Sequence, residues 1–231
     1  MSARPVTQHV FQVPLGMVNV FLIVLPEGIT MVDAGLRRSF PRIEKAIRAI
    51  GRRPEEVSDI VVTHLHADHT GGLAEARAAT GARVWMHPAD AGMVAAGKSH
   101  RPAAPVQGSV AGQIMAFFVG LTSGRVIPVI TDGLVNDREE IPVAGGLLPI
   151  WTPGHTEGHV AYLWPGDRGV LFVGDAARGG RAVKVSPIYE DYQRGLRSLH
   201  ELGALDFQVA CFSHGRPITQ DAARVFATTW R

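Results

Sequence analysis

One run of ten residues constrains this chain more than any other feature. Residues 63–72 place three histidines and one aspartate within six positions, directly after a predicted apolar strand. Alternation along an extended segment puts His64 and His66 on the same side. Asp68 and His69 lie where the chain turns toward the next helix, close enough to serve a neighbouring ion. Any one of them alone is better explained as a turn or helix-capping residue, but clustered imidazoles repel one another when protonated, and a bound metal ion ordinarily explains such a cluster.

Three more polar residues follow predicted apolar strands in the same way. His155 comes after the strand at 147–151, Asp175 ends the apolar run at 170–173, and His214 follows the strand at 207–212. Glycines stand beside all three residues. Strand ends carry side chains from distant parts of a sequence to one edge of a sheet. We therefore expect these residues to meet the histidine-rich run.

The composition excludes several classes of protein. The chain has 231 residues, 46% of them hydrophobic, and a formal net charge of +2, which is incompatible with a disordered chain. Cys211 is the only cysteine, so it forms no intramolecular disulfide and is expected to be a small buried core residue. The first residues do not resemble a secretory signal, and no apolar stretch is long enough to span a membrane. A cytoplasmic protein without membrane association is expected.

Strands and helices are predicted to alternate along the chain. Apolar runs predict strands at residues 18–25, 29–32, 59–63, 82–86, 126–130, 147–151, 160–164, 170–173 and 207–212. Helical spacing predicts helices at 39–50 and 189–202, and an alanine-rich run before Gly81 indicates one at 73–80. Helices are also expected at 90–98 and 219–229. Hairpins mixed with crossovers favour an α/β layered fold with mixed sheets. The sequence contains no linker or repeat, so we expect a single domain over 1–231, with a variable substrate-facing segment around 88–125.

The histidine and aspartate pattern closely resembles that of the metallo-β-lactamase superfamily. The signature of that family is H-x-H-x-D-H followed by a distant histidine, an aspartate and a last histidine. Matching residues occur here in order: His64, His66, Asp68, His69, His155, Asp175 and His214. Asp33, in residues 31–35, matches an early aspartate that orients a metal-binding imidazole in the family. The resemblance implies a four-layer αββα sandwich of two mixed β-sheets flanked by helices.

The resemblance also implies a binuclear metal centre. His64, His66 and His155 would hold one ion, Asp68, His69 and His214 the other, with Asp175 bridging them. The cofactor implied is two Zn²⁺ per chain, with iron or manganese as alternatives. A hydroxide shared by the two ions would then be the nucleophile at neutral pH. Asp68 is the candidate catalytic residue, moving a proton to the leaving group.

Differences between this sequence and individual branches of the family reduce the number of expected activities. Glyoxalase II adds a helical glutathione-binding domain after its last histidine, whereas this sequence stops at Arg231, soon after His214. Arg178 stands where lactonases of the family tend to carry tyrosine, and the intact ligand pattern argues against antibiotic cleavage. We expect a hydrolase that cleaves an ester, thioester or lactone of a small molecule. A mononuclear iron enzyme resembling persulfide dioxygenases is the alternative, followed by a phosphodiesterase or nuclease, and last by a silent metal-binding relic.

Other candidate features have simpler explanations. Basic residues between Arg38 and Arg53 are interpreted as the solvated face of a helix, so no nucleic-acid partner is expected. His159 is interpreted as a polar residue near the start of a strand, and the alternative is that it supports a metal ligand or faces the substrate. The segment 102–124 contains Met115, Phe117, Phe118 and Leu121, for which we predict an apolar lid or a homodimer contact.

Overall fold

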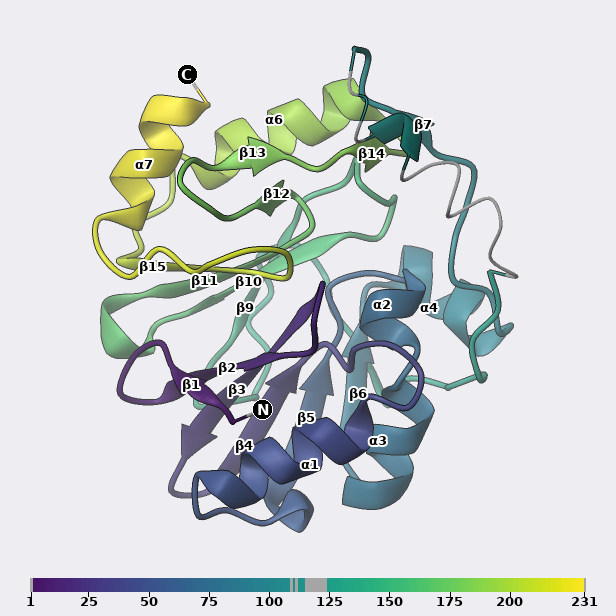
Figure 1. The fold of residues 1–231 in the computed structure, drawn as a ribbon, viewed down its shortest axis with the longest axis vertical. Helices are drawn as coiled ribbons and strands as arrows, with labels where there is room; N and C mark the ends of the chain where they lie inside the picture. Colours follow the sequence, from purple (N-terminus) through teal and green to yellow (C-terminus); the bar gives the residue numbers. More distant parts are fainter. Residues whose placement is uncertain (1, 109, 111, 115–123, 231) are drawn as a thin grey trace.

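The structure is a computed structural model that describes residues 2–108, 110, 112–114 and 124–230. Two β-sheets lie face to face between two layers of helices (Figure 1). The first sheet has seven strands. Their order is β1 (Arg4–Pro5), β2 (Val10–Pro14), β3 (Asn19–Leu25), β4 (Gly28–Val32), β5 (Val57–Val61), β6 (Arg83–Met86) and β8 (Gly133–Leu134). The strands from β1 to β4 pair antiparallel, and those from β4 to β8 pair parallel, so the sheet is mixed.

The second sheet has four strands and is also mixed. Their order is β15 (Val209–Phe212), β11 (Val170–Gly174), β10 (Val160–Trp164) and β9 (Leu148–Trp151). The pair β11 and β15 is parallel, whereas β9, β10 and β11 pair antiparallel. Two short ribbons complete the strands: β12 (Ala177–Arg178) with β13 (Lys184–Val185), and β7 (Ala104–Pro105) with β14 (Ile188–Tyr189).

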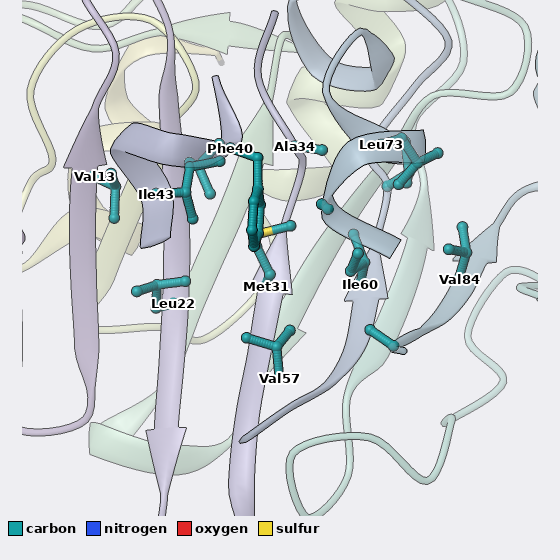
Figure 2. Close-up of a cluster of buried hydrophobic side chains, with 14 of the residues drawn as sticks. Val13, Leu22, Met31, Ala34, Phe40, Ile43, Val57, Ile60, Leu73 and Val84 are labelled. Atoms are coloured by element: carbon teal, nitrogen blue, oxygen red, sulfur yellow. The ribbon is translucent and has the colours of Figure 1, made fainter. Parts of the chain in front are cut away.

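Helices α1 (Phe40–Ala49) and α3 (Leu73–Thr80) cover the outer face of the first sheet (Figure 1). Ile43 and Ile47 are four residues apart in α1 and are fully buried, because that spacing puts both side chains on one helical face. Both belong to one core cluster with Leu22 and Met31 of the sheet. Figure 2 shows Ile43, Leu22 and Met31 in this cluster. The basic residues of α1 face outward and form local pairs such as Arg48 with Glu44, which confirms the solvated face predicted there.

The second sheet is covered by α6 (Tyr192–Leu202) and α7 (Ala222–Thr229). Leu199 and Phe226 pack there against the outward-facing residues of β11 and β15. A third core fills the space between the sheets, where Phe21 of β3 meets Phe172 of β11 with ring centroids 5.8 Å apart. Two short helices, α2 (Ala67–Thr70) and α4 (Pro88–Ala95), and two 3₁₀ turns, Pro54–Glu56 and Gly166–Arg168, occupy the connections. The four-layer αββα sandwich is confirmed.

The structure corrects the predicted elements at a few points. Residues 126–130 are not a strand: Pro128 lacks a backbone N–H, Ile130 is 74% exposed, and pairing with β6 begins only near Asp132. The N-terminal strands β1 and β2 were not predicted. Met115, Phe117, Phe118 and Leu121 lie outside the described residues, so the predicted lid or homodimer contact stays a prediction. Within the described part of the chain, no helix is both long and apolar enough to cross a membrane.

Candidate metal centre

The seven predicted ligands follow the ends of four strands and come together in space. In chain order, His64, His66, Asp68 and His69 follow β5, His155 follows β9, Asp175 follows β11, and His214 follows β15. Gly174 ends β11 with a φ of 59°, and a Cβ atom there would lie 2.5 Å from the His159 ring. Glycine is therefore required to bring the chain to Asp175.

Three imidazoles form a compact group that we call the imidazole triplet: His64, His66 and His155. The Nδ1 atom of His66 lies 3.0 Å from His64 Nε2 and 3.0 Å from His155 Nε2. His155 donates its Nδ1–H to the carbonyl of Ile188 at 3.0 Å, which leaves the Nε2 lone pair directed at the other two rings. Three ring nitrogens thus converge on one point.

Asp68, His69 and His214 form a second group, which we call the mixed triplet. His214 donates its Nδ1–H to the carbonyl of Met17 at 2.7 Å, and its Nε2 lies 3.2 Å from Asp68 Oδ2. The Nε2 atom of His69 lies 3.6 Å from the same carboxylate. The side chain of Asp68 is 34% exposed, so this triplet is reached from solvent.

Asp175 lies between the two triplets. One of its oxygens, Oδ2, is 3.5 Å from His155 Nε2 and 3.2 Å from His214 Nε2. The other, Oδ1, is 3.7 Å from His69 Nε2. Its carboxylate can therefore contact ions held by either triplet.

Asp33 orients one residue of the mixed triplet, His69. It is 1% exposed, and its Oδ2 accepts the Nδ1–H of His69 at 2.7 Å. Its Oδ1 accepts the backbone N–H of Thr63 at 2.8 Å. The carboxylate thus fixes the His69 ring with its Nε2 lone pair facing the site, and it holds the start of the loop that carries the histidine-rich run.

His159 is more closely tied to the site than its position near a strand start indicated. It is fully buried, and its Nε2 accepts the backbone N–H of Asp175 at 2.9 Å. Its Nδ1–H therefore donates to Thr152 Oγ1 at 2.7 Å. His159 positions Asp175. His159 does lie at the start of a strand, as predicted, and its bond to Asp175 agrees with the alternative role of supporting a ligand. The sequence does not reveal this contact, because it does not show that β10 begins beside the end of β11.

The imidazole triplet is electrically neutral at physiological pH. Burial is the largest cause: it lowers the pKa of all three rings, and neighbouring imidazoles lower it further for His64 and His66. The pKa of His66 falls to about 3. Each ring therefore keeps a lone pair available as a ligand.

In the mixed triplet, the surrounding groups favour the protonated, positively charged form of both histidines. Burial opposes protonation of His69 and His214, but the surrounding carboxylates outweigh it and raise their pKa to about 9 and about 11. Asp33 contributes most for His69, and Asp175 for His214. Burial alone would raise the pKa of Asp68 and Asp175, yet the neighbouring imidazoles hold both below the usual range. A bound divalent cation would be attracted by the same carboxylates that raise the pKa of His69 and His214.

Two buried atoms test whether these residues fit a metal. His69 Nε2 and Asp175 Oδ1 have no hydrogen-bond partner among the described residues. Buried polar atoms are rarely left without a partner, because each costs free energy. His64, His69 and Asp175 also have ligand atoms within 4.8 Å of one another, as do the members of each triplet. Nitrogen and carboxylate donors at this density fit one or more divalent metal ions.

Comparisons with known proteins agree with the fold. The model of the metallo-β-lactamase superfamily matches residues 13–214. A hydroxyacylglutathione hydrolase of Cereibacter sphaeroides is 31% identical over 221 residues, covering 93% of this chain and 71% of that protein. The uncharacterized protein YobT of Bacillus subtilis is 31% identical over 187 residues, covering 78% of this chain and 71% of that protein.

Solved structures of other proteins have a similar fold. A mutant metallo-β-lactamase of Cronobacter sakazakii with a HARLDQ motif has a TM-score of 0.72 at 25% identity, with 93% of this chain and 80% of that chain covered. The metallo-β-lactamase SMB-1 has a TM-score of 0.75 at 20% identity, with 100% and 93% covered, and shows the fold alone. The chain belongs to the metallo-β-lactamase superfamily.

Proposed function

We propose that the protein is a metal-dependent hydrolase that cleaves a thioester, or a related ester or lactone, of a small molecule bearing an anionic group. The observation that carries this proposal is the convergence of the seven side chains with nitrogen or carboxylate donors. Two of them have buried atoms without a hydrogen-bond partner among the residues that the structure describes. The name of the Cereibacter relative, a hydroxyacylglutathione hydrolase, supports a thioester substrate.

Each triplet would hold one zinc ion, with Asp175 contacting both. Neutral imidazoles suit zinc at the imidazole triplet, and the carboxylate of Asp68 adds an oxygen ligand at the mixed triplet. Bound zinc would lower the pKa of a water molecule toward 7 and polarise the substrate carbonyl. Asp33 and the Met17 carbonyl would keep the rings of His69 and His214 in their ligating orientation.

Asp68 has the properties of a proton-transfer residue. Its carboxylate is 34% exposed, and its lowered pKa keeps it ionised across the physiological range. In hydrolysis, the oxygen of water bonds to the acyl carbon and the carbon–sulfur bond breaks. Asp68 would accept the proton that this water loses and deliver it to the departing sulfur. The products are a carboxylic acid and a thiol.

A cationic cavity, one of whose lining residues bonds to the loop that carries His214, supports an anionic substrate. It measures about 950 Å³, and its charged lining residues are Arg178, Arg181 and Lys184. Among the described residues, none of these three forms an ion pair, and no carboxylate lines the cavity. Gly179, also in the lining, donates its N–H to the carbonyl of His214 at 2.9 Å, so the cavity wall contacts the metal-binding loop.

A substrate panel tests this function when it is run in parallel on the zinc-loaded and the iron-loaded protein. Thioesters with and without a carboxylate, esters, lactones, a phosphodiester and a persulfide would be assayed in parallel, with oxygen uptake followed for the persulfide. The proposal expects hydrolysis of thioesters and a preference for the carboxylate-bearing one. Oxygen consumption with the persulfide, an iron requirement, or cleavage of the phosphodiester alone would contradict it.

A further inference from the structure

One buried carboxylate outside the ligand set connects the two loops that carry the imidazole triplet. Asp90 lies in the first turn of α4 and is completely buried. Its Oδ2 accepts the backbone N–H of Leu65 at 3.0 Å and the hydroxyl of Thr156 at 2.8 Å. Its Oδ1 accepts the backbone N–H of Gly158 at 3.1 Å and Nη1 of Arg101 at 2.6 Å. Both oxygens are thus occupied by donors from three separate segments.

The donors have a specific relation to the imidazole triplet. Leu65 stands between His64 and His66, and Thr156 directly follows His155. Asp90 therefore holds the backbone beside all three imidazoles, although it approaches none of their ring nitrogens as a ligand. The mixed triplet has other anchors, since Asp33 orients His69.

The residues around Asp90 favour its contacts with the two histidine loops. A Cβ atom on Gly158 would lie 2.6 Å from Asp90 Cγ, so only glycine allows the loop to approach the carboxylate. Arg101 supplies the counter-charge that a fully buried carboxylate needs, and it also contacts Glu190 Oε1 at 3.5 Å. Glu190 in turn accepts the backbone N–H of Glu157 at 2.8 Å, a second bond to the loop that carries His155.

We propose that Asp90 is the positioning residue of the imidazole triplet: it sets the register between the two histidine loops so that three ring nitrogens meet at one metal ion. The inference rests on the proposed metal-dependent function. Residues that support metal ligands contribute about 10- to 100-fold to metal affinity. Loss of Asp90 should therefore weaken binding at the imidazole triplet while leaving the mixed triplet nearly unchanged.

Two sets of variants test this role. Asp90→Asn offers one acceptor oxygen in place of two, so two of the four donors lose their acceptor. Asp59→Asn is the matched control, because Asp59 is a 3% exposed carboxylate that accepts from Trp85 and Arg83 and bonds to neither histidine loop. Thr156→Val removes only one hydroxyl and is the milder variant should Asp90→Asn fold poorly. Thr156→Ser restores that hydroxyl.

The chelator-treated variants would be titrated with zinc, and binding would be followed by ¹⁵N NMR of the histidine rings and by competition with a chromophoric chelator. These measurements give the zinc affinity of each triplet separately. We expect Asp90→Asn and Thr156→Val to weaken zinc binding at the imidazole triplet by about 10- to 100-fold and up to about tenfold, respectively. Binding at the mixed triplet should change less than threefold. Thr156→Ser and Asp59→Asn should resemble the wild-type protein.

The possible outcomes are distinct. If the wild-type protein binds zinc but Asp90→Asn and Thr156→Val bind it with unchanged affinity, or lose it equally from both triplets, the role of Asp90 is refuted and the metal centre stands. If Asp59→Asn weakens the imidazole triplet as much as Asp90→Asn, a general loss of stability is the cause and the proposal fails. If the wild-type protein binds no zinc at either triplet, the proposed function and this inference both fail.

Discussion

The two triplets of the candidate centre lie side by side but differ in chemistry and in support. The imidazole triplet consists only of imidazole rings whose pKa is lowered, and Asp90 holds its loops. In the mixed triplet the pKa of both histidines is raised by carboxylates, and Asp33 orients one of them. Neutral imidazoles favour zinc and other transition metals, whereas carboxylates also accept manganese. Under the proposed function, metal identity would therefore be more strictly determined at the imidazole triplet.

The largest effect should follow from removing one ligand of either triplet. We expect His66→Ala and His214→Ala each to lower kcat/KM by roughly a thousandfold or more, beyond the ~10- to 100-fold typical of a supporting residue. Each variant should lose about one metal equivalent while the other triplet stays occupied. Elemental analysis and steady-state kinetics on the same preparations measure both quantities. Loss of both ions from either variant would show that the triplets are not separable.

Removing the support of the mixed triplet should have an intermediate effect. Asp33→Asn retains the volume of the side chain, but an amide cannot accept from Thr63 and His69 as a carboxylate does. We expect metal affinity at the mixed triplet to fall by about 10- to 100-fold, with the imidazole triplet less affected. Zinc competition measures this change. Equal weakening of both triplets would contradict separate anchoring.

The pH dependence of stability should have opposite signs for the two triplets in chelator-treated protein. The pKa of His66 is about 3, below the ordinary 6.5, so its burial costs stability as pH falls from about 6.5 toward 3. The raised pKa of His69 and His214 gives stabilisation that is complete below pH 6.5 and is lost as pH rises through about 9 and about 11.

Urea denaturation across this pH range should therefore give the greatest stability near pH 6.5, with a decline on both sides. Substituting His214 by asparagine should flatten the alkaline decline. A stability that rises steadily from pH 6.5 to 10 in the wild-type protein would contradict the charge state inferred for the mixed triplet.

The smallest effect should come from the cationic cavity, which lies outside both triplets. Replacing Arg181 and Lys184 together by alanine should raise KM for a carboxylate-bearing thioester roughly 3- to 10-fold, because partly exposed ion pairs contribute up to about 1 kcal/mol each. The value of kcat and the metal content should not change. An equal rise of KM for the uncharged thioester would rule out charge recognition by the cavity.

The sequence predicts this centre well where ligands follow apolar strands. The strand that becomes β5 is recognisable by its apolar residues, and the histidine-rich run directly follows it, so the position of the site at a strand end could be inferred. The hairpin of β3 and β4 was likewise predicted, from two apolar runs separated by residues 26–28, and α3 was predicted from an alanine-rich run that ends at Gly81.

Supporting residues could not be predicted in the same way. Asp90 takes its donors from segments between 11 and 68 residues away in the sequence, and no local pattern encodes these contacts. His159 contacts Asp175 only because two strands pair antiparallel. The strand expected at 126–130 shows the reverse error, in which an apolar run containing Pro128 stays outside the sheet.

The central claim is that two metal ions occupy the two triplets. Elemental analysis of protein purified without chelator, combined with ¹⁵N NMR of the histidine rings, tests it most directly. The account predicts about two zinc equivalents per chain, with metal-shifted ring nitrogens for the imidazole triplet and for both histidines of the mixed triplet. Protein that retains no metal and takes up none on zinc addition, or whose histidine spectrum is unchanged by zinc, would contradict it.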